Sequence, residues 1–150
     1  MTNTINKDEI KKLLPHREPM LLIDKLINIV PLKSATAIIN VKKGNFYFDG
    51  HFPGQPVMPG VIIVEAFGQA AAALTAHGID SKEYENKLVY LMSVDRARFR
   101  NPVMPECKLF LEVEAIRSHG RVWRYKGVAK VNGINMADAE WAATIMDRNK

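Results

Sequence analysis

Cysteine is nearly absent from this 150-residue sequence, which contains Cys107 alone. A single cysteine excludes an intrachain disulfide and any metal centre built from several cysteine ligands. The N-terminal segment lacks the apolar core of a signal peptide, and no segment has the length and composition of a membrane span. Internal repeats, low-complexity tracts and domain linkers are absent too. We therefore expect one domain, residues 1–150, in a cytoplasmic protein.

Negative charge is in the minority, since 21 Lys and Arg residues outnumber 16 Asp and Glu residues and give a formal net charge of +5. This balance favours an acidic partner, either nucleic acid or an acidic protein. The basic residues are scattered apart from Lys42-Lys43 and the set Arg96, Arg98 and Arg100, and they form no stripe interleaved with aromatic residues. We therefore expect no nucleic-acid partner.

One stretch near the middle of the chain combines a loop with an unusually apolar helix. Residues 50–60 contain three prolines and three glycines, a composition that predicts a turning loop. Val61–Ala76 has no proline and one internal glycine, and apolar residues lie all round its predicted circumference, as in a buried helix. At 16 residues this helix is shorter than the ~20 needed to cross a bilayer. We expect a core helix that ends at His77-Gly78.

Glu65 is the one ionisable side chain between Val61 and Ala76. A carboxylate is almost never fully buried without a partner, and isolated burial raises its pKa. His51 lies at the entrance of the loop that leads into the helix. An acid of raised pKa and an imidazole near the free N–H groups of a helix N-terminus form a candidate acid–base pair. The alternative for Glu65 is a structural carboxylate that accepts hydrogen bonds from backbone N–H groups.

The rest of the chain is patterned for one short helix and a sheet. Asn6 is followed by acidic and apolar residues that predict a capped helix ending at Pro15, and Asn132-Gly133 is the strongest hairpin signal. A polar loop is expected at 79–87. Consecutive hairpins give an antiparallel sheet with one covered face, and the apolar helix is available to cover it. The predicted fold class is α+β, a curved antiparallel sheet wrapped round one long central helix. The expected strands are Met20–Val30, Ser34–Val41, Leu88–Phe99, Lys108–Ala115, Trp123–Val131 and Ala137–Ile145.

Three runs of residues resemble a known family. They are Gly50-His51-Phe52-Pro53-Gly54 … Pro59-Gly60-Val61 … Glu65-Ala66 … Gln69, then Leu14-Pro15-His16-Arg17 … Leu21-Leu22-Ile23-Asp24, and Asp95-Arg96-Ala97-Arg98-Phe99-Arg100 … Pro102-Val103. Together they resemble the hot-dog-fold β-hydroxyacyl-acyl carrier protein dehydratases of fatty acid synthesis, of the FabZ type. The chain departs from that pattern at Gly44-Asn45, where the family usually has Asn-Glu, and at Glu18 and Ser93.

The resemblance implies a hot-dog fold and a 3-hydroxyacyl-[acyl carrier protein] dehydratase without metal or bound cofactor. It makes His51 the base that takes the C2 proton, Glu65 the acid that protonates the leaving hydroxyl, and the Gly60 amide the donor to the thioester carbonyl. It also implies an acyl carrier protein as partner, with the His and Glu of one site supplied by different subunits. A homodimer is then the minimum unit, and a trimer of dimers is an open alternative.

Other residues of these runs have a structural and a functional interpretation. Phe52 and Met58 are core residues by default and would otherwise bind the acyl chain of the substrate. Gln69 is expected to orient a neighbouring group or to pack in the core, and not to act as a catalyst. The arginines at 96, 98 and 100 are a solvated face or contacts for an acidic carrier protein. The remaining histidines, His16, His77 and His119, are expected at turns or on the surface, without a role.

Two competing functions share the fold. A hot-dog acyl thioesterase would use a carboxylate to activate water and would need no base over C2, so His51 argues against it. A non-catalytic acyl-binding homologue is favoured by the Gly44-Asn45 departure and disfavoured by the presence of both His51 and Glu65.

Overall fold

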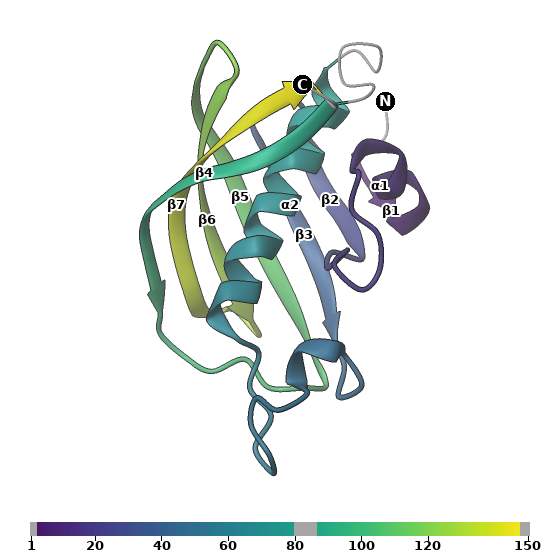
Figure 1. Cartoon of the computed structure of the whole chain (residues 1–150), viewed down its shortest axis with the longest axis vertical. Helices are drawn as coiled ribbons and strands as arrows, with labels where there is room; N and C mark the ends of the chain where they lie inside the picture. The colour runs from purple at the N-terminus through teal and green to yellow at the C-terminus, as the bar shows by residue number, and fades with distance from the viewer. Residues whose placement is uncertain (1–2, 80–86, 148–150) are drawn as a thin grey trace.

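A computed structural model of the chain describes residues 3–79 and 87–147. Within them, one antiparallel sheet of seven strands has the order β1-β2-β3-β5-β6-β7-β4 and curves round the helix α2, Gly60–Gly78 (Figure 1). The α+β architecture with a central helix is therefore confirmed. A second helix, α1, covers Lys7–Leu13, and a 3-10 helix, η1, covers Phe46–Phe48. The strands are β1 Ile5–Asn6, β2 Lys25–Val30, β3 Ser34–Val41, β4 Lys87–Phe99, β5 Cys107–His119, β6 Val122–Val131 and β7 Ile134–Asp147.

The helix α2 packs closely on the sheet because β6 has a glycine at the contact. A Cβ atom added to Gly127 would lie 2.7 Å from Cδ1 of Phe67, a helix residue that is 1% exposed. The Phe67 ring instead stacks on the indole of Trp141, with ring centroids 5.2 Å apart. One turn from the end of the helix, the buried hydroxyls of Thr75 and Tyr125 form a hydrogen bond of 2.5 Å. These contacts fix α2 along the inner face of the sheet.

The length of α2 corrects one expectation. The helix has 19 residues because it includes Gly60 and continues through Gly78, and its mean hydropathy reaches 1.3. By length and composition alone it is the candidate for a membrane span among the described residues, so the prediction that it is too short was wrong. The burial of the helix nevertheless supports its assignment as a core helix. Within the protein 61% of the apolar window is buried, as is typical of a core helix.

The first helix follows its sequence signals. The Asn6 side chain accepts a hydrogen bond from the Glu9 N–H at 3.0 Å, and the Glu9 carboxylate accepts one from the Asn6 N–H at 3.2 Å. This reciprocal capping box fixes the start of α1. Ile10 is completely buried, and the helix ends at Leu13 before Pro15 as predicted.

The strand predicted over Met20–Val30 was wrong in its first half, because β2 begins at Lys25. Residues 21–23 are apolar and buried, so composition alone does not distinguish them from a strand. Backbone groups of this segment bond to a side chain of α2 instead of to a neighbouring strand. The Leu22 N–H donates to Oε1 of Gln69 at 2.8 Å, and the Met20 carbonyl accepts from Nε2 of Gln69 at 2.7 Å.

The other predicted strands are present, and several are longer than the alternation indicated. The two-residue strand β1 was not predicted, since a segment so short has no measurable periodicity. Of the polar loop expected at 79–87, residues 80–86 lie outside the described residues.

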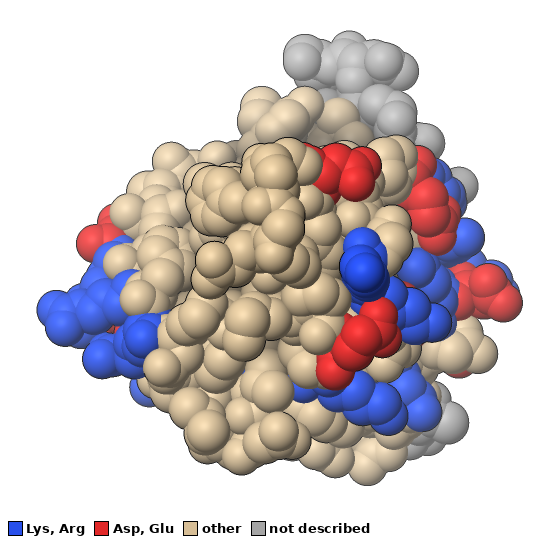
Figure 2. Space-filling view, turned by 90° about the horizontal axis from the view of Figure 1, so that it is seen from below, with Lys and Arg blue, Asp and Glu red and all other residues tan. Residues whose placement is uncertain are grey.

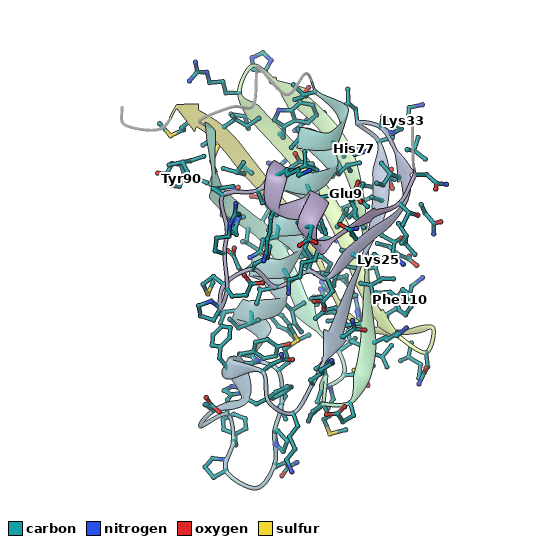
Figure 3. All side chains as sticks on the ribbon, turned by 90° about the vertical axis from the view of Figure 1, so that its right-hand side faces the viewer. Glu9, Lys25, Lys33, His77, Tyr90 and Phe110 are labelled. Carbon is teal, nitrogen blue, oxygen red and sulfur yellow. The ribbon has the colours of Figure 1, made fainter. Side chains whose placement is uncertain are left out.

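The last strand in the sheet order, β4, forms an apolar edge. It pairs with β7, and its other side is the end of the sheet. Figure 3 shows Tyr90 pointing away from the body of the molecule at this edge. Large apolar side chains are 40–54% exposed along the strand: Tyr90, Leu91, Met92, Val94 and Phe99. A long, exposed apolar edge of this kind is a surface to which another chain can pair.

Candidate active site

The loop between η1 and α2 is a closed turn that projects from one end of the molecule (Figure 1). The Val57 N–H donates to the His51 carbonyl at 2.9 Å and closes the loop at its base. Within it, Phe52 and Gln55 exchange backbone hydrogen bonds of 3.1 and 2.9 Å. Gly54 has a φ of +76°, a conformation that side chains disfavour, so the tight turn requires glycine.

The hydrogen bond of His51 defines its tautomer. Nδ1 lies 2.7 Å from the Val57 carbonyl oxygen. A carbonyl only accepts, so Nδ1 carries the hydrogen and Nε2 of the neutral ring carries the free lone pair. The ring is half-buried, and the Phe52 ring stacks on it with centroids 3.9 Å apart. His51 therefore presents a basic nitrogen in a fixed orientation.

A cleft of about 470 Å³ brings His51 together with the start of α2. No side chain caps this helix, whose N-cap residue is Pro59. The Ile62 N–H donates to the Pro59 carbonyl at 3.0 Å, so the amides of Gly60 and Val61 are the first-turn donors left to bind an anionic or carbonyl oxygen. Phe52, in contrast, is 52% exposed and does not line the cleft. The lining residues are His51, Val57, Met58, Gly60, Val61, Ile63, Phe99, Arg100, Asn101, Pro102 and Val103.

Glu65 lines a different and narrower cavity of the same chain. Glu65 follows Gly60 by five positions in the helix. It therefore lies about 7.5 Å further along the axis and is rotated about 140° round it relative to Gly60. Within the described part of a single protomer, the candidate acid and base therefore lie in separate cavities. The residues of the second cavity are His16, Val64, Glu65, Gly68, Ala72, Val89, Leu91 and Ala143.

Two polar side chains contact Glu65. Nε2 of Gln69 donates to Oε2 of the carboxyl at 3.0 Å, and Nε2 of His16 lies 3.5 Å from the same oxygen. Burial raises the pKa of Glu65, but the contacts with His16 and Gln69 lower it, and the net pKa lies below the usual value. The expected raised pKa is wrong for the isolated protomer, because the carboxyl has partners and its side chain is still 34% exposed.

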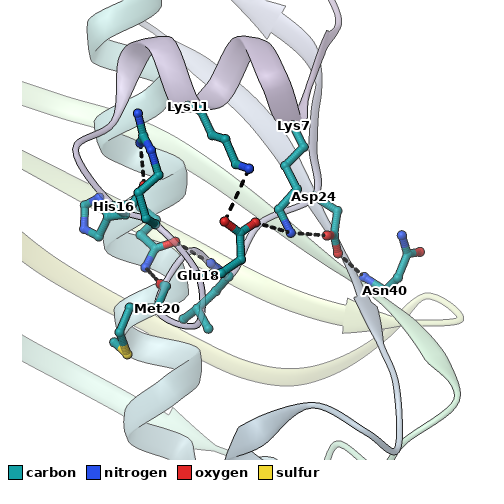
Figure 4. A network of polar contacts seen from close by, with 10 residues as sticks. Lys7, Lys11, His16, Glu18, Met20, Asp24 and Asn40 are labelled. Carbon is teal, nitrogen blue, oxygen red and sulfur yellow. Dashed lines mark hydrogen bonds and ion pairs between the residues drawn. The ribbon is translucent and has the colours of Figure 1, made fainter.

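His16 corrects another expectation, since it is not a solvated turn residue. The loop that carries it lies between α1 and α2 and is held there by ion pairs (Figure 4). Glu18 lies 3.5 Å from Nζ of Lys7 and 3.3 Å from Nζ of Lys11. A backbone hydrogen bond and the Lys11 ammonium lower the pKa of Glu18, which keeps it ionised for these pairs. The ion pairs also give a reason for glutamate at this position.

The other two histidines differ from each other. His77 lies in the last turn of α2, half-buried, and its Nδ1 is buried without a hydrogen-bond partner among the described residues (Figure 3). The expectation of a solvated side chain was therefore wrong for His77. His119, at the end of β5, is exposed as predicted. No group of three or more His, Cys, Asp or Glu side chains suited to a metal ion occurs in residues 3–79 and 87–147.

The FabA-like domain family matches residues 14–140, a range that contains His51, Gly60 and Glu65. The chain belongs to the FabA-like family. Among curated members, it is 49% identical over 141 residues to the 3-hydroxyacyl-[acyl-carrier-protein] dehydratase FabZ of Myxococcus xanthus, covering 94% of this chain and 92% of the relative. It is 47% identical over 144 residues to the FabZ of Rhodospirillum rubrum, covering 96% and 89%. The FabZ-type resemblance identified from the sequence is confirmed.

Solved structures show the same fold for this FabA-like chain at much lower identity. A chain of the dehydratase heterocomplex ApeI:P from Xenorhabdus doucetiae superposes with a TM-score of 0.79 at 16% identity, over 94% of this chain and 91% of that one. The virulence protein Cj0977 from Campylobacter jejuni superposes with a TM-score of 0.63 at 15% identity, over 95% and 90%. The hot-dog fold therefore persists where most of the sequence has changed.

Proposed function

We propose that this protein is a 3-hydroxyacyl-[acyl carrier protein] dehydratase that converts 3-hydroxyacyl thioesters to trans-2-enoyl thioesters in fatty acid synthesis. The observation that carries the proposal is the hydrogen bond from Nδ1 of His51 to the Val57 carbonyl, which leaves Nε2 as a base. This nitrogen shares a cleft with the uncapped start of α2. The FabZ relatives carry the same activity in their names. A cytoplasmic location is part of the proposal.

Three groups divide the reaction between them. Nε2 of His51 takes the C2 proton, and the electrons of that C–H bond form the C2–C3 double bond. The bond from C3 to the hydroxyl oxygen breaks, and Glu65 gives its proton to that oxygen, so that water leaves. The Gly60 N–H, at the positive end of the helix dipole, stabilises the negative charge that develops on the thioester oxygen. Met58, which lines the cleft, contributes apolar surface for the acyl chain.

One complete site needs two protomers in this proposal. Within a chain, His51 and Glu65 line separate cavities, so the Glu65 that meets a given His51 comes from the second copy. The apolar edge of β4 offers the surface for that copy. Val61, which lines the His51 cleft, is 76% exposed and would be covered in the dimer. Covering Glu65 would also remove water from its carboxyl and favour the protonated form that an acid needs.

The acyl carrier protein approaches on the arginine-bearing side of the cleft. Arg96 and Arg98 lie on one face of β4, Arg100 follows them and lines the cleft, and all three side chains are exposed. Arg96 and Arg100 are paired with Glu140 at 3.9 Å and Asp138 at 2.5 Å, which leaves donors on each guanidinium free. Seen from the loop end, lysines and arginines, with acidic side chains among them, flank a broad uncharged surface (Figure 2).

Incubation of the purified protein with a 3-hydroxyacyl carrier-protein thioester tests the proposed activity. Formation of the enoyl thioester, detected by mass loss of one water, supports it. Release of the free hydroxy acid would instead identify a thioesterase, and an unchanged thioester that stays bound would identify a non-catalytic acyl-binding protein. The His51→Ala variant is the matched control, because it retains Glu65 and the β4 edge while lacking the base.

A further inference from the structure

The two oxygens of the Glu65 carboxyl have different surroundings. Oε2 accepts the hydrogen bond from Gln69 and faces Nε2 of His16. No hydrogen bond or ion pair reaches Oε1 from residues 3–79 or 87–147. The cavity beside the carboxyl is otherwise lined by apolar or glycine residues. His16 is therefore the ionisable side chain that contacts Glu65 within this part of the protein.

Backbone groups fix the orientation of the Gln69 amide. The Leu22 N–H must bind an acceptor, which identifies Oε1 of Gln69, at 2.8 Å. The Met20 carbonyl must bind a donor, which identifies Nε2, at 2.7 Å. The second hydrogen of the same NH₂ group then points at Oε2 of Glu65. Gln69 is 1% exposed, so it cannot exchange these partners for water.

The environment of His16 favours a hydrogen on Nε2 rather than on Nδ1. Nδ1 is buried and has no hydrogen-bond partner among the described residues. A hydrogen on this atom would be a buried, unpaired N–H group, which is unfavourable. With Nδ1 unprotonated, the N–H of the ring lies at Nε2, which is 3.5 Å from Oε2 of Glu65. Arg17 holds this geometry by donating to the His16 carbonyl at 2.6 Å.

We propose that His16 is a positioning residue for the acid: with Gln69 it directs N–H groups at Oε2 of Glu65 and so places the transferable proton on Oε1. A carboxyl oxygen that accepts two N–H groups is a poor site for a proton, so a neutral Glu65 carries its proton on the other oxygen. That oxygen is the one left free to meet the leaving hydroxyl. The inference rests on the proposed role of Glu65 as the general acid.

Kinetics of two His16 variants test the positioning role. His16→Leu keeps the bulk but removes the donor, and we expect kcat to fall about 10- to 100-fold with little change in KM, as for a displaced catalytic group. His16→Gln places a side-chain N–H at a similar distance from the backbone, and we expect it to recover most of the lost kcat. A full-rate His16→Leu enzyme overturns the proposal. Equal losses of kcat in the two folded variants also overturn the proposal. They would indicate that His16 acts by taking up and releasing a proton, which neither leucine nor glutamine can do. His119→Gln, on the exposed end of β5, is the matched control.

Nuclear magnetic resonance gives a readout that does not depend on turnover. In ¹⁵N-histidine-labelled wild-type protein we expect the His16 ring to carry a hydrogen on Nε2, and a ring with its hydrogen on Nδ1 alone overturns the proposal even if no variant folds. In a His51→Ala background, His16→Leu raises the pKa of Glu65, because the carboxylate loses a donor. An unchanged pKa contradicts the contact. If the wild-type protein lacks dehydratase activity, the proposed function fails while these measurements still decide the contact.

Discussion

A Cβ atom placed on Gly60 would lie 2.9 Å from Cε1 of the Phe99 ring. Gly60 begins α2 and Phe99 ends β4, so this contact joins the two elements that border the His51 cleft. Two requirements for glycine coincide here. The ring needs the space, and in the proposed reaction the thioester oxygen needs close access to the backbone amide. The Phe99 side chain is 54% exposed and can rotate away, which allows the two requirements to be separated.

Gly60→Val is expected to lower dehydration by about 10²-fold or more, because the new side chain keeps the thioester oxygen away from the backbone N–H, with the fold intact by circular dichroism. Adding Phe99→Ala makes room for the new side chain within the protomer. If the thioester is what needs the space, the double variant stays inactive. Recovery of activity in the double variant would show that glycine is needed at position 60 only to make room for the Phe99 ring. An unfolded Gly60→Val protein would identify a structural glycine.

Glu65→Gln is expected to reduce turnover by on the order of 10²-fold or more, because an amide cannot give the proton. The variant should fold, since the new side-chain oxygen can still accept the hydrogen bond from Gln69. Steady-state kinetics and a thermal melt measure the two effects. Near-normal dehydration by Glu65→Gln would remove Glu65 from the mechanism.

The histidines outside both cavities provide a control. His119→Ala should leave turnover unchanged and alter the free energy of unfolding by no more than about 0.5 kcal/mol, as is typical of surface sites. His77→Ala should also keep turnover, but its half-buried position on α2 predicts a lower thermal midpoint. A large catalytic loss in either protein would show that a different histidine is the base.

Periodic patterns predicted most of the fold. The all-round apolar composition of Val61–Ala76 identified the core helix, and the alternation in residues 108–115 identified a strand of the sheet. The prediction failed at Leu22, where buried apolar residues bond to a helix side chain that lies 47 positions later in the sequence. A partner that distant leaves no mark on the local pattern.

The contact between His16 and Glu65 was missed for the same reason. The two residues come from different elements, and neither the spacing nor the composition of Pro15–Pro19 indicates that its imidazole meets the helix. A signal was nevertheless present, since His16 lies inside a run that resembles the family. The lowered pKa of Glu65 was equally hidden, because it depends on that contact and on Gln69.

Mixing two inactive proteins tests whether one site draws on two subunits. His51→Ala lacks the base and Glu65→Ala lacks the acid, so each homodimer is inactive. After subunit exchange, a two-fold heterodimer has one site with both residues and one with neither. Full random exchange makes about half of the dimers mixed, so roughly a quarter of the wild-type activity should return. The separate cavities of His51 and Glu65 in one chain are the reason to expect this recovery.

The matched control mixes His51→Ala with a second preparation of His51→Ala carrying a different tag, which reports the extent of exchange without restoring a site. If His51 and Glu65 of one chain served the same site, every site in the mixture would keep one lesion and no activity would return. Verified exchange without recovery would therefore contradict the shared site. It would require the loop of residues 50–60 to bring His51 to the Glu65 of its own chain, against the turn closed by Val57.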